Sequence, residues 1–268
     1  MCNARETIVA GIDAGSTAIK IALYDGQQFL CRQRPAGWSP REESQTLLTE
    51  ITAEWHSTPE AVAAIVGTGY GRVSLTGLTK ALTEITCHAK GASHLVPGAR
   101  TVIDIGGQDS KVIRIDADRR VEEFLMNDKC AAGTGRFLQV MNTVLGLDFN
   151  QANDFLPPDT EVCKINSMCT VFAESEVIGL LNKGVAREAS VAGIYQSIAA
   201  RIGAMAGRLG VVEPVVFTGG LSRLPAIHQA LEKELRCTII IPELALYAGA
   251  VGAALFAWEQ QTTMTRRD

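Results

Sequence analysis

Residues 101–116 read TVIDIGGQDSKVIRID, and residues 10–25 read AGIDAGSTAIKIALYD. Each stretch is an apolar strand, a turn of small and polar residues, and a second strand, which is the pattern of a β-hairpin. The two align without a gap at an offset of 91 residues, and four polar or glycine positions match: Asp13 with Asp104, Gly15 with Gly106, Lys20 with Lys111, and Asp25 with Asp116. Shared β propensity alone rarely gives that agreement, so the hairpins predict an internal duplication of a lobe.

The segments around the hairpins alternate between helical and strand patterns. Helical patterns near 43–55 and 75–92 flank a short strand around AAIVGTGYG. After the second hairpin come three helical stretches that each end near a glycine, then a strand, a glycine turn and a helix. The last stretch, ALYAGAVGAALFAWEQ, is a helix whose small residues allow a neighbouring backbone to approach closely. The fold class is α/β, and we expect one lobe over 1–97 completed by a helix at 246–268, and a second lobe over 98–245.

Composition excludes several classes of protein. The chain has 268 residues, 47% of them hydrophobic, and a net charge of −4 without a long Lys/Arg run. No nucleic-acid or membrane partner is therefore expected. The sequence has neither a signal-peptide core nor a run of about eighteen apolar residues, which favours a cytoplasmic protein. Seven cysteines without C-x-x-C spacing favour reduced thiols over a disulfide framework.

Both hairpin turns place an aspartate at the end of a strand, followed by glycine and polar residues. Bare N–H groups and hydroxyls in a tight turn suit phosphate oxygens, and a nearby carboxylate suits Mg²⁺. The candidates are Asp13, Gly15, Ser16 and Thr17 in the first turn, and Asp104, Gly106, Gly107 and Gln108 in the second. A third element, VVFTGGLSR, is a strand followed by Gly219 and Gly220, which would let an adenosine lie against the backbone. Each element alone is more often a plain turn.

Taken in order, these elements and the last helix resemble the phosphate motifs, the adenosine motif and the second connecting helix of the actin, sugar-kinase and Hsp70-like ATPase superfamily. The resemblance spans nearly the whole chain. It implies two ribonuclease-H-like lobes with ATP in the cleft between them, and lobe closure coupled to the nucleotide state. The sequence contains no Walker A pattern and no dinucleotide G-x-G-x-x-G after a strand, which disfavours those nucleotide folds.

Cys130 and Cys169 share a local context that the other cysteines lack. Cys130 precedes AAGTGRFLQVM and Cys169 precedes TVFAESEVIGLL, so both thiols are expected at or just before a helix N-terminus, where anions are stabilised. Cys163, by contrast, precedes a segment expected to be a strand. Cys130 and Cys169 are also compatible with small buried residues that pack a helix end. Two thiols are too few for a [4Fe–4S] cluster, but a homodimer supplies four, and a Zn²⁺ site of the same composition is chemically possible.

The segments NDKCAAGTGRFL, CTVFAESEVIGLL, GIDAGSTAIK, DIGGQDSK and FTGGLSR together resemble the activator component of 2-hydroxyacyl-CoA dehydratases. The wider family includes the ATPase subunits of benzoyl-CoA reductase. The resemblance implies a homodimer with one bridging [4Fe–4S] cluster, whose ligands map onto Cys130 and Cys169. It also implies that ATP hydrolysis drives a low-potential, one-electron transfer. The electron would come from an upstream ferredoxin or flavodoxin and pass to a partner iron–sulfur dehydratase or CoA-ester reductase.

This hypothesis assigns roles to residues beyond the cysteines. Lys20 joins the first turn in holding phosphates and Mg²⁺, and either Gln108 or Asp104 orients the attacking water. Phosphate contacts are also expected from the segment that follows Cys130, namely Gly133, Thr134 and Gly135. That segment would link the nucleotide to the cluster over a few residues.

Other interpretations of the same residues remain open. Lys20 and Lys111 are equally compatible with solvated strand residues, and Glu174 and Glu176 with carboxylates that stabilise the first turn of a helix. A small-molecule kinase of the same superfamily would need an acceptor-binding base in the first lobe, and none is identified. A nucleotide-dependent regulatory module would bind ATP without hydrolysis or iron. A zinc-bridged structural dimer would be colourless.

Overall fold

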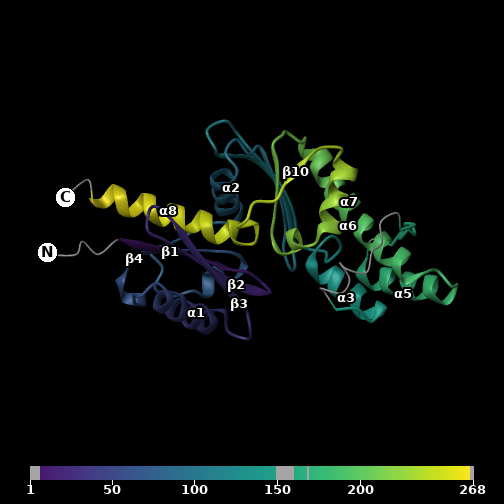
Figure 1. Cartoon of the computed structure of the whole chain (residues 1–268), viewed down its shortest axis with the longest axis horizontal. Helices are drawn as coiled ribbons and strands as arrows, with labels where there is room; N and C mark the ends of the chain where they lie inside the picture. Colours follow the sequence, from purple (N-terminus) through teal and green to yellow (C-terminus); the bar gives the residue numbers. More distant parts are fainter. Residues whose placement is uncertain (1–6, 149–159, 168, 266–268) are drawn as a thin grey trace. The chain divides into compact units, whose positions relative to one another are not determined.

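The computed structural model describes residues 7–148, 160–167 and 169–265. The chain divides into two compact units (Figure 1). Unit 1 comprises the residues up to 98 together with 115–121 and those from 247 onward, and unit 2 comprises 99–114 and 122–246. Each unit is built on a five-stranded sheet. In the part of the chain that is described, no helix is long and apolar enough to cross a membrane.

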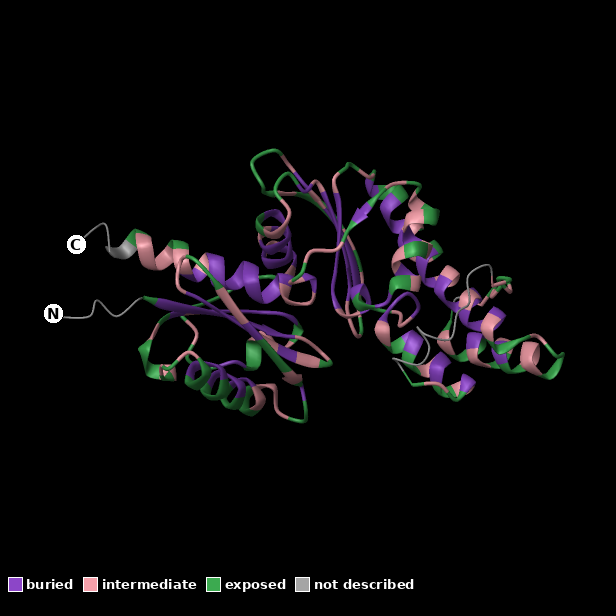
Figure 2. Cartoon of the chain, viewed as in Figure 1, coloured by how far each residue is buried: buried purple, intermediate pink, exposed green. Residues whose placement is uncertain are grey.

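The sheet of unit 1 is centred on the first hairpin. Its strand order is β3-β2-β1-β4-β5, and the strands are β1 (Ile8–Ala14), β2 (Ala18–Tyr24), β3 (Phe29–Pro35), β4 (Val62–Thr68) and β5 (Lys80–Ala81). β1 pairs antiparallel with β2 and parallel with β4. β1 is buried along its whole length (Figure 2), which is why its sequence is almost continuously apolar.

Helices cover both faces of this sheet. α1 (Pro40–Glu54) packs Leu47, Leu48 and Ile51 into the core beside β2 and β3, and short 3₁₀ turns lie at Pro59–Ala61 and Tyr70–Ser74. α2 (Glu84–Leu95) and α8 (Ala248–Thr265) lie against each other, and α8 also packs on β1 and β4 (Figure 1).

The predicted helix at 75–92 begins too early, because α2 starts only at Glu84. The preceding residues are extended beside β4, where the amides of Thr79 and Leu82 donate to the carbonyls of Ile65 and Gly67. Leu75 and Leu78 have the spacing of a helix face. Both side chains instead lie against Gly67, so apolar spacing alone gave the wrong element here.

Three glycines allow α8 to approach β1 and α2 at backbone distance. A Cβ on Gly11 would lie 2.0 Å from the carbonyl oxygen of Ala250, and one on Gly91 would lie 1.9 Å from that of Ala248. A Cβ on Gly252 would lie 1.9 Å from the carbonyl oxygen of Cys87. The expectation that the Ala/Gly-rich last helix permits close approach is confirmed.

Unit 2 repeats the sheet of unit 1. Its order is β8-β7-β6-β9-β10, and the strands are β6 (Thr101–Ile105), β7 (Ser110–Ile115), β8 (Val121–Asn127), β9 (Val215–Thr218) and β10 (Ile239–Ile240). β6 pairs antiparallel with β7 and parallel with β9, as β1 does with β2 and β4. The duplication predicted from the hairpins is confirmed. The third strand of each sheet, β3 or β8, was not predicted.

Among its described residues, unit 2 contains the helices α3 (Gly135–Leu145), α5 (Thr170–Asn182), α6 (Arg187–Leu209) and α7 (Pro225–Leu235), with 3₁₀ turns at Gly220–Arg223 and Ala245–Tyr247. The core joins α3, α6 and β9, with Phe137, Tyr195 and Phe217 among its largest buried side chains. Gly146 ends α3 in the left-handed conformation, with φ of +63°, as expected for a C-terminal glycine.

Candidate functional site

The turn of the first hairpin holds a buried carboxylate beside a lysine. Asp13 is directly opposite Lys20 in the hairpin register, with 4.0 Å between Asp13 Oδ2 and Lys20 Nζ. The amide of Gly15 donates to the carbonyl of Ala18 and closes the turn at 3.1 Å. The tip residues, including Thr17, are at least partly exposed. This turn therefore presents backbone and hydroxyl groups above a buried negative charge.

The turn of the second hairpin has the same register with a tighter ion pair. Lys111, only 2% exposed, places Nζ 3.3 Å from Asp104 Oδ2 and 2.5 Å from Asp109 Oδ1. The amide of Gly106 donates to the carbonyl of Asp109 at 2.9 Å, the counterpart of the turn closure in unit 1. The interpretation of Lys111 as a solvated residue is wrong, because its charge is buried against two carboxylates. Gln108 is exposed at the tip.

The glycine turn after β9 lies against the Asp104 carboxylate. Thr218 donates through its hydroxyl to Asp104 Oδ1 at 2.9 Å. Gly219 has φ of +89°, and a Cβ there would lie 2.4 Å from the carbonyl oxygen of Ile105 and 2.8 Å from Asp104 Oδ1. Only glycine fits this position. The structure thus brings Asp104, Gly106 and Gly219 to one end of the unit 2 sheet.

Unit 1 contains an equivalent glycine that was not predicted as a site residue. Gly69 follows β4 with φ of +87°, and a Cβ on it would lie 2.4 Å from Asp13 Oδ1. The strand β4 ends in Thr68, as β9 ends in Thr218. A Thr-Gly pair at the end of the parallel strand is therefore part of the duplication. The Thr-Gly pair within AAIVGTGYG is the sequence signal that could have identified Gly69 as a site residue.

The N-terminus of α3 is hydrogen-bonded directly to the second turn. The amide of Gly135 donates to the carbonyl of Gly106 at 2.9 Å, and that of Arg136 donates to the carbonyl of Gly107 at 2.8 Å. Thr134 is the N-cap residue of α3. Gly133 has φ of +80° and lies against the side chain of Arg201. The predicted phosphate segment is thus fixed to the turn through its own backbone.

Cys130 lies in a loop, and one amide side chain holds that loop. Cys130 is half-buried and lies four residues before the N-cap Thr134, so it precedes α3 by a short loop and is not at the helix N-terminus itself. From the end of β8, Asn127 Nδ2 donates to the carbonyls of Cys130 at 2.8 Å and Ala132 at 2.9 Å. We refer to Asn127 and these two carbonyls as the Asn127 clamp.

Cys169 is the exposed N-cap residue of α5, in agreement with the predicted helix start. Glu176, two turns along α5, accepts from the Asn166 amide at 2.9 Å, from Asn166 Nδ2 at 3.1 Å and from the Ser167 amide at 2.8 Å. Burial alone would raise the pKa of Glu176, but these hydrogen bonds outweigh it and lower the pKa to about 2. Glu176 therefore secures the loop before Cys169 and does not belong to the first turn of α5. We refer to this set as the Glu176 clamp.

The remaining cysteines have different environments. Cys163 is half-buried, its amide donates to the carbonyl of Ala189, and the residues after it do not form the predicted strand in the described segment 160–167. Burial raises the pKa of Cys31 and Cys87 to about 12. Cys2 lies outside the described residues. In the described part of one chain, no three His, Cys, Asp or Glu residues are grouped to hold a metal ion.

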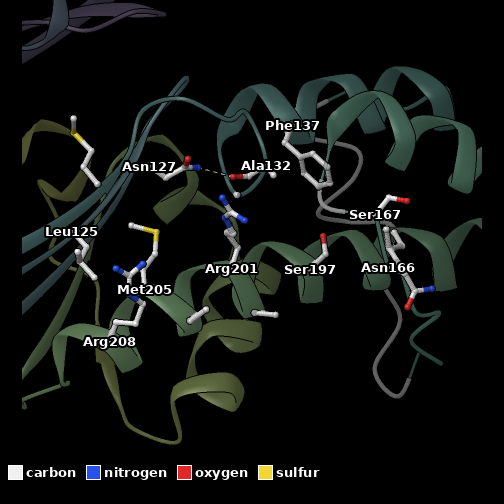
Figure 3. Close-up of a pocket in the computed structure, with 15 residues that line it drawn as sticks. Leu125, Asn127, Ala132, Phe137, Asn166, Ser167, Ser197, Arg201, Met205 and Arg208 are labelled. Carbon is white, nitrogen blue, oxygen red and sulfur yellow. Dashed lines mark hydrogen bonds between the residues drawn. The ribbon is translucent and has the colours of Figure 1, made fainter.

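A cavity of about 510 Å³ lies within unit 2 (Figure 3). Its wall includes Asn127 and Ala132 on the Cys130 side, and Asn166 and Ser167 on the Cys169 side. α6 supplies other lining residues, among them Ser197, Arg201, Met205 and Arg208. Because residues of both clamps line one cavity, the two cysteine loops are parts of a single local structure.

The model of the BadF/BadG/BcrA/BcrD ATPase family matches residues 10–257. The chain belongs to this ATPase family. The (R)-2-hydroxyglutaryl-CoA dehydratase activating ATPase of Acidaminococcus fermentans is 43% identical to it over 252 residues, 93% of this chain and 96% of that protein. The 2-hydroxyisocaproyl-CoA dehydratase activator of Clostridioides difficile is 39% identical over 251 residues, 93% of this chain and 94% of that protein.

A solved structure agrees with this family assignment. The activator of the 2-hydroxyisocaproyl-CoA dehydratase from Clostridium difficile, with bound ADPNP, matches with a TM-score of 0.93 and 37% identity over 98% of both chains. Together with the sheet order of the two units, this confirms the predicted actin, sugar-kinase and Hsp70-like ATPase fold. The predicted resemblance to dehydratase activators is confirmed as well. An ATPase-family assignment also favours nucleotide hydrolysis over the small-molecule kinase alternative.

In this ATPase-family chain, thiol reactivity should follow burial. With iron absent, iodoacetamide at about pH 8 should modify Cys169 first among the six described cysteines, because that thiol is exposed and reaction requires an accessible thiolate. Cys31 and Cys87 should stay unmodified, since a pKa near 12 keeps them protonated and burial blocks access. Mass spectrometry of tryptic peptides after timed labelling checks the order. Early labelling of Cys87 would contradict the packing of unit 1.

Proposed function

We propose that this chain is an ATP-hydrolysing iron–sulfur protein that passes a low-potential electron to a 2-hydroxyacyl-CoA dehydratase or a related CoA-ester reductase. The observation that carries the proposal is the direct backbone connection between the second turn and the segment after Cys130. The amides of Gly135 and Arg136 bond the carbonyls of Gly106 and Gly107, so a change at the turn displaces the start of α3. The activators named above are relatives over nearly the whole chain.

The nucleotide would be held by the two duplicated turns. In this proposal the lobes 1–97 with 246–268 and 98–245 close on ATP. One lobe contributes Asp13, Gly15, Ser16, Thr17 and Lys20, and the other contributes Asp104, Gly106, Gly107 and Gln108. The buried carboxylates suit Mg²⁺, directly or through water, and Asp104 or Gln108 orients the attacking water. Gly219 and Gly220 face the adenosine, and Gly133 and Thr134 lie beside the phosphates.

Cys130 and Cys169 fit the thiolate ligands of a [4Fe–4S] cluster. Both are free thiols at least partly accessible. One clamp fixes the loop that contains Cys130, and the other fixes the loop that leads into Cys169. Bound there, the cluster would supply one-electron transfer at low potential. One chain offers two such thiols, so a second subunit completes the set of four. The first turn of α5 offers a surface for this homodimer, because the adjacent Val171 and Phe172 beside Cys169 are 66% and 68% exposed and could pack against a second subunit.

The electron would enter from a reduced ferredoxin or flavodoxin and leave to the partner enzyme. Lobe closure on ATP is the step proposed to connect hydrolysis with the cysteine loops. The clamps and the backbone bonds between α3 and the second turn are the parts of this chain that would transmit that movement. The chemistry on the acyl-CoA belongs to the partner.

Anaerobic purification with iron and sulfide analysis tests the cluster. The wild-type protein, after reconstitution, should hold about four irons per dimer, as one [4Fe–4S] cluster requires. Cys130→Ser should lose most of this iron, because a hydroxyl is a poor ligand for it. Metal analysis also separates the zinc alternative, which would give a colourless protein that contains zinc.

Cys163→Ser is the matched control. Cys163 lies six residues before Cys169, but its Sγ packs toward Gly193 in the interior of unit 2. This variant should keep the wild-type iron content. Fewer than about two irons per dimer in reconstituted wild-type protein would remove the cluster from the proposal.

A further inference from the structure

Glu176 is placed to fix the backbone that leads into Cys169. Its two carboxylate oxygens accept three hydrogen bonds from Asn166 and Ser167. Those residues lie two and three positions before Cys169, while Glu176 lies seven positions after it. The carboxylate therefore links the second turn of α5 to the loop that precedes the N-cap of this helix. Three hydrogen bonds to one ionised group restrict the loop more strongly than bonds between neutral groups would.

Asn127 performs the corresponding task for Cys130. Its Nδ2 group donates both of its protons within the loop, to the carbonyls of Cys130 and Ala132. The first acceptor is the peptide oxygen of the cysteine itself, so the amide fixes the backbone from which the thiol projects. Asn127 ends β8, and the loop is thereby attached to the sheet of unit 2.

Helix capping and strand pairing do not explain why Asn127 and Glu176 occupy these positions. Glu176 lies in the second turn of α5, beyond the amides that a helix N-terminus leaves open. The side chain of Glu174, on the same helix, makes no hydrogen bond or ion pair with another described residue. Asp128, next to Asn127, is exposed and likewise unpaired within the described ranges. The clamps are thus specific to two positions, and both serve a cysteine loop.

We propose that Asn127 and Glu176 are positioning residues that hold the two thiolates in the geometry the cluster requires. This inference rests on the proposed function. Groups that orient metal ligands from outside the coordination sphere set both the retention and the electronic properties of a metal centre, and removing one costs about 10-fold or more. Because Asn127, Asn166 and Ser167 line one cavity (Figure 3), disturbing either clamp also changes the wall that the two loops share.

Two near-isosteric substitutions test the clamps. Glu176→Gln keeps the volume but places an NH₂ group where a carboxylate oxygen now accepts from a donor, so one acceptor and the negative charge are lost. Asn127→Asp sets a carboxylate against two carbonyl oxygens, which reverses both interactions. Each reconstituted variant should release iron to a ferrous chelator about 10-fold faster than wild type. The EPR spectrum and the midpoint potential of the reduced cluster should also differ from wild type.

Glu174→Gln and Asp128→Asn are the controls, since each changes the charge beside a clamp without touching it. Glu174→Gln repeats the charge loss of Glu176→Gln, and Asp128→Asn changes the charge by the same amount as Asn127→Asp with the opposite sign. Both should match wild type in iron release, EPR spectrum and potential. If Asn127→Asp does not fold, Asn127→Ala, which removes the bonds without adding charge, takes its place. Equal iron release and identical spectra in clamp and control variants overturn the positioning role. Absence of iron from the wild-type protein instead overturns the proposed function, and the inference falls with it.

Discussion

We expect Asp104→Asn to hydrolyse ATP about a hundredfold more slowly than the wild-type chain, the scale for loss of one preorganised electrostatic contact. The amide keeps an acceptor for the Thr218 hydroxyl, which bonds Asp104 Oδ1 at 2.9 Å. It removes the negative charge that faces Lys111 at 3.3 Å. A neutral amide is also a weaker Mg²⁺ ligand than a carboxylate. Phosphate release at saturating MgATP, measured at steady state, gives the rate.

Asp118→Asn provides the matched control for this prediction. Asp118 is exposed in the turn between β7 and β8, away from the turn that joins β6 to β7. The Asp118→Asn variant should hydrolyse ATP at the wild-type rate. Binding of a fluorescent ATP analogue to both variants separates a binding defect from a hydrolysis defect. Unchanged turnover in Asp104→Asn would remove Asp104 from the mechanism and leave Gln108 as the candidate that orients water.

The centre of each sheet could be predicted because its signals are local. Two apolar strands around a small turn define a hairpin within about twenty residues. The register within each hairpin was not predicted, and the structure shows that Asp13 with Lys20 and Asp104 with Lys111 are directly opposite pairs. The third strands escaped prediction because they lie at sheet edges. β8 carries two glutamates among mostly exposed side chains, and charged side chains on an edge strand oppose aggregation.

Part of the candidate site depends on contacts that sequence spacing does not encode. The helix start at Cys169 was predicted from a local pattern, whereas Cys130 falls in a loop. The clamps of Asn127 and Glu176 form only when a loop folds back on a strand or a helix. The burial of Lys111 likewise depends on Asp109 and Asp104 converging in three dimensions. Local sequence therefore identifies candidate residues here, but tertiary structure determines their surroundings.

The Ala/Gly-rich final helix was predicted by composition, and it leads to the largest expected effect on stability. Gly252→Ala should lower the free energy of unfolding by about 3 kcal/mol, the upper range for overpacking. A methyl group there would lie 1.9 Å from the carbonyl oxygen of Cys87 and 2.9 Å from the amide nitrogen of Gly91. These are backbone atoms of α2, so no side-chain rotation relieves the clash. Urea unfolding followed by circular dichroism measures the change.

Gly207→Ala is the matched control, because the sign of its effect should be opposite. Gly207 lies within α6, and a Cβ there would meet nothing within 4 Å. Alanine in a helix interior is favoured over glycine by about 1 kcal/mol, so this variant should be slightly stabilised. The higher helix propensity of alanine also acts at Gly252, so the predicted loss of stability requires the steric conflict with α2 to be larger than this gain. A stabilised Gly252→Ala variant would mean that α8 can move away from α2, and that the small residues of this helix are not needed for its close packing.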